Sequence, residues 1–402
     1  MSMKKIYTIL ALSLSLQAQT LQETINYSIK NSYQLQILEE ESSIINEQKK
    51  IESFWNDPIL KVGINDIQGD KPFSRNLEAM QNQFVTYSQT IPLSEKLEVA
   101  SEIEEEKKRV VEQKAEALKV NIAFGIKKSF IDAINAEKTL TILDNYISFL
   151  NTPMNLFINL SAVERNSVDK YIKTQLLQKS YQLQRENALQ RIEIAKENIE
   201  LIGNFKIDSF SDNVMIKRYE QQPLEILLSQ IKEKNPQLKM LIALKEVADK
   251  GIKLAGEKEQ ADITVTGGYY QRFNRNDYVS FSVAYPLYTH GKQERQKVQA
   301  IKRANIQELS YKQTKIALEQ GLKIAVHELK ALQQEVEILE ASRLKIVKRI
   351  ANAKSELSTG GSLVRYYELF SQKTDNALEL NRKALAIALI ENKISQLLGE
   401  VS

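Results

Sequence analysis

The stretch FVTYSQTIPL at residues 84–93 returns in altered form as YVSFSVAYPL at residues 278–287, with four of the ten positions identical. In the second stretch Val279, Phe281 and Val283 alternate with small or hydroxyl-bearing residues. Alternation with a period of two predicts a β-strand that has one apolar face. The recurrence of a whole strand pattern predicts that the chain is one structural unit written twice.

The duplication extends outward from these strands over nearly the whole chain. Residues 32–35 (SYQL) align with residues 235–238 (NPQL), Gly125 aligns with Gly321, and both copies close alike, as LIG at 201–203 and LLG at 397–399. The resulting organisation is a signal segment at 1–18, a first structural repeat at 19–203, a polar connector at 204–222 and a second structural repeat at 223–402.

A second strand precedes each of the two quoted stretches. In the second copy Ile263, Val265 and Tyr269 alternate with Thr264 and Thr266. Each copy therefore contributes two strands with one apolar and one polar face. Because the polar face has no apolar ladder to meet a second sheet, we expect a lipid-facing outside and a wet inside. The alternative is an ordinary soluble hairpin packed on helices.

A very long helix follows the strands in each copy, because no proline occurs between Pro92 and Pro153 or between Pro286 and Gly360. At 1.5 Å per residue, about 65 residues span about 100 Å. Two apolar stripes in the first long helix predict two helical neighbours. They are Ile126, Phe130, Ala133, Leu140, Leu143, Ile147 and Leu150, and beside them Phe124, Ile131, Ile134, Ile142, Tyr146 and Phe149.

The N-terminus has the pattern of a secretory signal. Lys4 and Lys5 precede an apolar run from Ile6 to Leu16, and Ala18 offers a small residue for cleavage, with a signal anchor as the alternative. No other stretch has the roughly 20 consecutive apolar residues of a membrane helix, so any membrane crossing by the mature chain would use β-strands. The absence of cysteine suits an oxidising compartment.

Composition argues against two other classes of function. A formal charge of only +4, evenly spread, does not indicate a nucleic-acid-binding surface. With two histidines, His290 and His327, no cysteine and no phosphate-binding glycine loop, the chain does not read as an enzyme, and we expect neither a cofactor nor a metal site.

Four strands alone leave two open sheet edges. The unpaired backbone N–H and C=O groups of these edges find no hydrogen-bond partner in hydrocarbon, so the chain must oligomerise. A trimer gives 12 strands and some lumen, whereas a dimer gives a small barrel filled by side chains.

The sequence resembles the TolC family of outer-membrane efflux proteins over essentially the whole mature chain. Asn235-Pro236-Gln237-Leu238 matches the Asn-Pro-x-Leu near the start of the family's repeats, and Pro286-Leu287 matches the Pro-Leu that closes its second strand. The first copy departs from this pattern, with Ser32-Tyr33 in place of Asn-Pro.

The resemblance implies a mainly α fold with a small β part, built from a duplicated helix, helix, strand, strand, long helix, helix unit. It further implies a homotrimer whose 12-stranded β-barrel in the outer membrane continues as a long α-helical barrel through the periplasm. The implied partners are outer-membrane lipid, a periplasmic adaptor protein and an inner-membrane pump. The implied function is that of an exit duct.

The turns after the long helices are the expected adaptor-docking tips. In the second copy Gly360 and Gly361 permit a left-handed turn and Ser362 can cap the returning helix. The first copy offers Arg165, Asn166 and Ser167, with Ser167 as the expected cap.

Four residues just past the tips are candidates for a periplasmic gate: Asp169, Arg365, Tyr366 and Glu368. The alternative for these residues is a solvated helix surface, which is also what we expect for the mixed-charge run from Glu102 to Arg109.

Two alternative functions remain open. A soluble periplasmic coiled-coil scaffold would share the signal and the apolar stripes, but it gives no reason for strands that recur in the same phase. Within the family, export of small toxic compounds or metal ions through a proton-driven pump competes with polypeptide secretion through an ATP-driven one. The compact length favours export by analogy.

Overall fold

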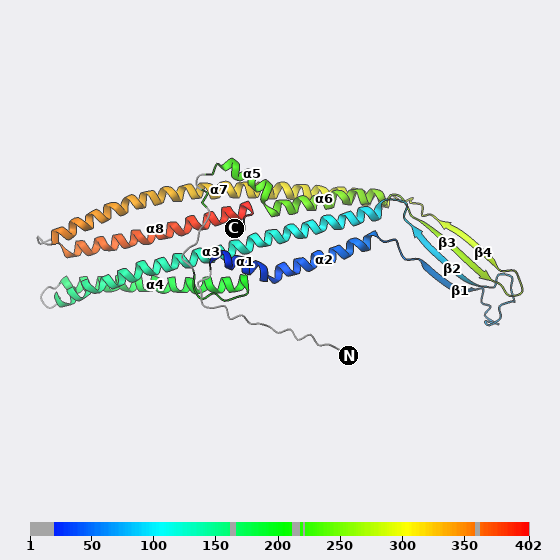
Figure 1. The fold of residues 1–402 in the computed structure, drawn as a ribbon, viewed down its shortest axis with the longest axis horizontal. Coiled ribbons are helices and arrows are strands. Elements are labelled where there is room, and N and C mark those ends of the chain that lie inside the picture. Colours follow the sequence, from blue (N-terminus) through cyan, green and yellow to red (C-terminus); the bar gives the residue numbers. More distant parts are fainter. Residues whose placement is uncertain (1–19, 161–165, 211–217, 220–221, 358–361, 402) are drawn as a thin grey trace. The chain divides into compact units, whose positions relative to one another are not determined.

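The computed structural model describes residues 20–160, 166–210, 218–219, 222–357 and 362–401 (Figure 1). The described elements are α1 (Leu21–Asn31), α2 (Tyr33–Ser53), β1 (Ile59–Asn65), β2 (Asn82–Ile91), α3 (Lys96–Leu160), α4 (Asn166–Gly203), α5 (Leu224–Lys234), α6 (Pro236–Glu257), β3 (Ile263–Gln271), β4 (Tyr278–Ala284), α7 (Lys292–Leu357) and α8 (Leu363–Leu398). The order helix, helix, strand, strand, long helix, helix thus occurs twice. The mainly α class with a small sheet is confirmed.

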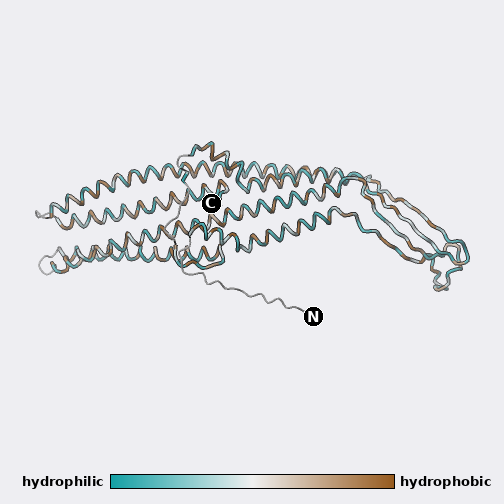
Figure 2. Tube along the Cα trace, viewed as in Figure 1, coloured by the Kyte–Doolittle hydropathy of each residue, from teal (hydrophilic) through white to brown (hydrophobic). Residues whose placement is uncertain are grey.

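The long helices are confirmed as well. α3 has 65 residues and α7 has 66, and α3 continues through Pro153 to Leu160. Figure 2 shows short apolar stretches interspersed with polar ones along the helices and strands. Among the described residues, no helix is both long enough and apolar enough to cross a membrane.

The chain forms two compact units. One contains the described residues within 20–35, 117–235 and 317–401, and the other contains residues 36–116 and 236–316. We call the first the tip unit and the second the sheet unit.

The sheet unit joins four helical segments to one four-stranded sheet. Its ion pairs give the helix order α2, α3, α6, α7: Lys49 to Glu105 links α2 with α3, Lys250 to Glu102 links α6 with α3, and Lys245 to Glu308 links α6 with α7. The strands lie in the order β1-β2-β3-β4, each antiparallel to its neighbour, so β1 and β4 are the edges.

The register of the sheet puts apolar residues on one face. Leu60 pairs with Tyr87, which pairs with Gly267, which pairs with Phe281. In the next row of that face Val62, Val85, Tyr269 and Val279 are paired. Side chains of this face are exposed, Phe281 by 83% and Val62 by 74%. Large apolar side chains therefore cover a surface that no described residue of the chain buries.

The opposite face is polar. Across the central strand pair, the hydroxyls of Ser88 and Thr266 lie 2.8 Å apart and those of Thr90 and Thr264 lie 2.9 Å apart. At the far end Asn65 donates to Asn82 over 3.1 Å. Cross-strand hydroxyl pairs of this kind stabilise a sheet, and they mark a face compatible with water.

The tip unit is a layer of helices in the order α4, α3, α8, α7. Arg185 on α4 pairs with Asp144 on α3, Asn135 on α3 bonds to Asn381 on α8, and Asn376 on α8 donates to the carbonyl of Leu339 on α7. The two predicted neighbours of α3 are therefore α4 and α8. The largest fully buried side chains of this unit are Phe130, Ile25, Ile126, Leu143, Leu150, Ile199, Leu227, Ile231, Leu322, Leu369 and Ile394.

Each repeat begins with a short helix that packs on the end of its own last helix. α1 starts with a capping box in which Thr20 and Glu23 bond reciprocally, and Ser28 lies against Gly203 at the end of α4. In the second repeat Asn235 ends α5 and donates from its side chain to the carbonyl of Leu397. Ser32 ends α1 in the same way that Asn235 ends α5, so the helix break survives the replacement of Asn-Pro by Ser-Tyr.

The connector at residues 204–222, expected to be polar, contributes apolar anchors in its described part. Ile207, Phe210 and Tyr219 are buried, and the ring of Phe210 meets that of Phe130 edge to face at 5.1 Å. The Tyr219 hydroxyl donates to Glu400 over 2.6 Å. The apolar residues of this stretch follow neither a helical nor a strand period, which is why the sequence alone did not predict this packing.

Candidate functional site

At the second tip, contacts on both sides of the turn hold α7 and α8 together. Ser362 caps α8, its hydroxyl accepting from the Arg365 main-chain N–H at 3.4 Å, as the sequence predicted. The Arg365 guanidinium lies 3.5 Å from the Glu356 carboxylate at the end of α7. Gly360 and Gly361 fall outside the described residues. Arg365 therefore ties the two helices of its own hairpin together.

At the first tip one expectation changes. α4 already begins at Asn166, so Ser167 is its second residue and is buried rather than standing at the cap position. Arg165 falls outside the described residues, as does the side chain of Asn166. Asp169 lies exposed in the first turn of α4, where a negative charge is favoured by the helix dipole.

Of the remaining gate candidates, Glu368 is exposed on α8, whereas Tyr366 is part of an aromatic cluster. Its ring lies 5.0 Å from Phe370, and Phe370 stacks on Phe149 of α3 with the ring centroids 4.4 Å apart. Tyr367 also meets Phe149, at 5.5 Å. The residues just past the second tip are thus packed against α3 by rings rather than presented wholly to water.

A buried tyrosine pair lies next to this cluster. Tyr146 of α3 and Tyr181 of α4 meet edge to face at 5.0 Å, and the Tyr181 hydroxyl donates to Asp375 of α8 over 2.7 Å. Burial raises the pKa of Tyr181, and the hydrogen bond to the Asp375 carboxylate raises it further, since ionisation of the phenol would break that bond. Burial raises the pKa of Tyr146 as well. This arrangement joins three helices close to the tips.

Asparagine side chains connect α8 to the backbone of α3. Asn392 donates to the carbonyl of Phe124 over 3.0 Å, and Gln396 donates to the side chain of Asn121 over 3.0 Å. Asn135 and Asn381 bond reciprocally further toward the tips. These amides fix the position of α8 along α3.

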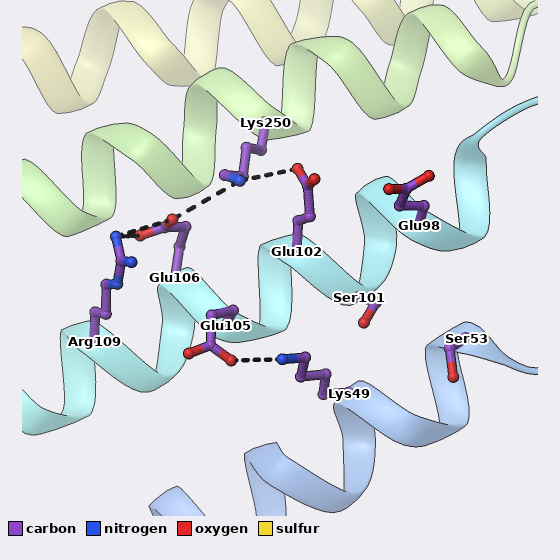
Figure 3. A pocket seen from close by; sticks show the side chains of 9 residues that line it. All are labelled: Lys49, Ser53, Glu98, Ser101, Glu102, Glu105, Glu106, Arg109 and Lys250. Carbon is purple, nitrogen blue, oxygen red and sulfur yellow. Dashed lines mark hydrogen bonds and ion pairs between the residues drawn. The ribbon is translucent and has the colours of Figure 1, made fainter.

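The sheet unit holds an open cleft of about 510 Å³ lined almost entirely by polar side chains from α2, α3 and α6 (Figure 3). Lys250 of α6 lies 2.9 Å from the Glu102 carboxylate and 3.8 Å from that of Glu106. Lys49 of α2 pairs with Glu105 at 2.8 Å. The hydrogen bond from Lys250 holds the pKa of Glu102 below its usual range.

The mixed-charge run from Glu102 to Arg109 is therefore not simply a wet helical face, and that expectation is wrong for part of it. Glu104 and Glu106 are each only 6% exposed. Arg109 donates to both carboxylate oxygens of Glu106, at 3.2 and 3.1 Å. The burial of these glutamates could not be predicted from the sequence, because a charged run does not distinguish a buried glutamate that is paired with a cation from a solvated one. No group of three or more acidic or histidine side chains in the described part of the chain could hold a metal ion.

No family model and no curated protein matches the sequence. Solved structures match over nearly the whole chain. The outer-membrane protein VceC of Vibrio cholerae has a TM-score of 0.76 at 12% identity, covering 94% of this chain and 96% of its own. CusC, described in terms of transmembrane channel formation, gives 0.76 at 13% identity with 96% and 93% coverage.

The open-state outer-membrane channel MtrE of Neisseria gonorrhoeae gives a TM-score of 0.74 at 15% identity, covering 94% of this chain and 89% of its own. Identities this low establish shared architecture. The chain has the fold of the TolC-like outer-membrane channels.

Proposed function

We propose that this chain is one subunit of a homotrimeric exit duct in the outer membrane, working with a periplasmic adaptor and an inner-membrane pump. The duct passes small toxic compounds or metal ions to the exterior, and the pump is proton-driven rather than ATP-driven. The solved outer-membrane channels that share the fold support this assignment.

The polarity of the sheet is the observation that carries the proposal. One face exposes a continuous set of large apolar side chains, including Leu60, Val62 and Phe281, while the other face is polar. A soluble protein rarely leaves such a patch uncovered. A β-barrel wall requires this division, with the apolar side toward lipid and the polar side toward a watery lumen.

Open edges in both units support the trimer. In the sheet unit β1 and β4 are unpaired edges, and α2 and α7 are the outer helices. α2 exposes Ile37, Ile44 and Ile51, spaced seven residues apart, and the same unit's part of α7 exposes Leu309 and Ile316 at that spacing. Apolar residues every seventh position form helix-to-helix seams. Pairing the α7 edge of one chain with the α2 edge of the next buries both.

The outer helices of the tip unit also expose apolar residues at heptad spacing. α4 exposes Leu176 and Leu183, seven residues apart, and α7 exposes Ile324 and Ile338, two heptads apart. A closed helical wall of three chains would cover these residues too. Within that wall we assign adaptor docking to the two tips, at residues 165–167 and 360–362, and the aperture to Asp169, Arg365, Tyr366 and Glu368.

A soluble periplasmic scaffold is the competing function. It could use the same heptad residues, but it leaves the exposed apolar face of the sheet unexplained. Polypeptide secretion through an ATP-driven pump would use the same duct, and differs in the partners rather than in this chain.

Cysteine labelling separates the duct from the scaffold, and the chain is free of native cysteine. Phe281→Cys places a thiol on the apolar face and Ser280→Cys places one on the polar face of the same strand. In isolated outer membranes a charged maleimide should label Ser280→Cys and spare Phe281→Cys until detergent is added. Equal labelling of both, or recovery of the protein in the soluble periplasmic fraction, would refute the duct.

A further inference from the structure

Three aromatic rings stack across the polar face of the sheet. Phe84 pairs in register with Tyr270, which pairs with Tyr278, on three adjacent strands. The ring centroids of Tyr270 and Tyr278 are 4.7 Å apart with an interplanar angle of 4°, and Phe84 lies 5.7 Å from Tyr270. We call these three residues the aromatic ladder. It occupies the last paired row before the hairpin between β3 and β4.

Two glycines make room for the ladder. A Cβ added at Gly63 would lie 2.4 Å from the Phe84 ring, and one at Gly268 would lie 2.8 Å from the Tyr270 ring. Both distances are far inside van der Waals contact, so only glycine allows the rings to lie where they do. The ladder is thus built into the backbone of the sheet.

A positive charge lies at each end of the ladder. The Lys61 ammonium is 5.7 Å from the Phe84 ring and the Arg272 guanidinium is 5.2 Å from the Tyr278 ring. Within the four strands, which the structure describes in full, Lys61 is the one charged residue. The nearby acid Asp277 accepts from the Arg272 main-chain N–H and from the Tyr269 hydroxyl, and Tyr269 belongs to the opposite face.

The charge distribution of stacked rings decides which ligand the ladder prefers. An aromatic ring is negative on its face and positive at its edge. In the ladder Tyr270 stacks between Phe84 and Tyr278, and each outer ring lies near one of the two cations, so the electropositive groups of the ladder are the C–H edges, the tyrosine O–H hydrogens and the two cations. Such a surface attracts the π-face and the carboxylate of a planar aromatic acid, and it repels an aromatic cation.

We propose that the ladder is a selectivity site for planar aromatic carboxylates at the outward end of the lumen. This rests on the proposed function, because the polar face becomes a lumen only in the closed trimer. Three copies of the ladder, each with its Lys61 and Arg272, would then line the exit, making that section anion-selective.

Saturation-transfer NMR on the trimer in nanodiscs tests the proposal, with 2-naphthoate as the probe. We expect transfer to 2-naphthoate but not to cyclohexanecarboxylate or to naphthylmethylammonium, and none in empty nanodiscs. Tyr270→Thr and Lys61→Gln should each weaken 2-naphthoate binding about three- to ten-fold. Gly268→Ala, which displaces the Tyr270 ring without removing it, should weaken binding too. Tyr87→Thr, on the opposite face, is the matched control and should not.

The outcomes separate this proposal from the duct on which it rests. If a stable trimer forms but Tyr270→Thr binds 2-naphthoate as the wild type does, or the aromatic cation binds as well as the acid, the ladder proposal is overturned and the duct stands. If the purified chain is monomeric, both are overturned.

Discussion

Asn135 on α3 and Asn381 on α8 each donate a side-chain hydrogen bond to the other's main-chain carbonyl, over 2.7 and 3.0 Å. Asn381 also donates to the Thr139 hydroxyl. The Asn135 carbonyl also accepts from the Thr139 hydroxyl of its own helix, over 2.9 Å. The pair holds two long helices in one register within the tip unit.

Removing one partner should therefore destabilise the tip unit. We expect Asn381→Ala to lower the free energy of unfolding by about 0.5–1.5 kcal/mol, because the Asn135 carbonyl and the Thr139 hydroxyl lose the Asn381 side-chain donor, whereas the Asn135 amide keeps the main-chain carbonyl of residue 381. Urea unfolding followed by circular dichroism measures the change. Asn352→Ala, at an exposed position of α7, is the control and should change little. Equal effects of the two substitutions would show that the reciprocal bonds contribute nothing.

Alkaline pH should weaken the contact between Tyr181 and Asp375. Because the folded pKa of Tyr181 lies above its unfolded value of about 10, its contribution to stability is complete below pH 10 and declines as the pH rises further. The wild type should therefore be more stable than Tyr181→Phe by a constant amount from pH 7 to pH 9, and the difference should shrink above pH 10. A difference independent of pH up to 12 would contradict this. Thermal unfolding of both proteins across the range provides the data.

The two aligned glycines of the long helices should respond differently to alanine. A Cβ at Gly321 would lie 3.8 Å from Leu397, an ordinary contact, whereas one at Gly125 would lie 2.7 Å from the Ile202 side chain. Gly321→Ala should raise stability by about 0.5–1 kcal/mol through helix propensity. Gly125→Ala should gain less or lose stability, since Ile202 must move. The urea midpoints of the two variants measure these changes in stability. A larger gain for Gly125→Ala than for Gly321→Ala would contradict the prediction.

The ion pairs of the charged cleft should differ in importance. Lys250→Ala removes the partner of Glu102 and a neighbour of the nearly buried Glu106, whereas Lys49→Ala breaks a pair in which both side chains are well exposed. Exposed pairs contribute little. We expect the shift of the urea midpoint to be roughly twice as large, or more, for Lys250→Ala. Added salt should reduce the effect of Lys49→Ala first.

The exposed heptad residues should control assembly rather than folding of the chain. Ile44→Glu places a charge in the proposed seam between α2 of one chain and α7 of the next, and should shift trimers toward monomers in detergent while leaving the helical content unchanged. Ser43→Glu, one position away and also exposed, should leave the trimers intact. Light scattering coupled to size-exclusion chromatography reports both masses. Identical masses for the two variants would show that Ile44 does not lie in a seam between α2 and α7 of neighbouring chains.

Periodicity predicted most of the fold. The alternation at Val279, Phe281 and Val283 gave the strands, and the stripe from Ile126 to Leu150 gave α3 with its two neighbours. These signals survive because burial imposes a fixed spacing on apolar residues. The break at Ser32 was harder to predict, because serine ends a helix through its local backbone and side-chain geometry rather than through a fixed φ like that of proline.

Most polar contacts could not be predicted from the sequence. Asn135 and Glu106 are buried and Asn381 is half-buried, although a helical wheel assigns polar side chains to solvent. Ser167 was expected at the cap of α4 but lies two positions further in, as its second residue, because helix ends follow no periodic pattern. The aromatic ladder was missed for another reason: Phe84, Tyr270 and Tyr278 come together only through the strand register.

The proposed duct requires three chains to close their open edges in the outer membrane. Single-particle electron microscopy of the protein extracted from outer-membrane fractions would show this closure. We expect a three-fold particle in which β4 of each chain pairs antiparallel with β1 of the next, the apolar sheet face lies outward against detergent, and α7 packs on the neighbour's α2 and α4. A monomer, or an assembly in which the β1 and β4 edges stay unpaired, would contradict it.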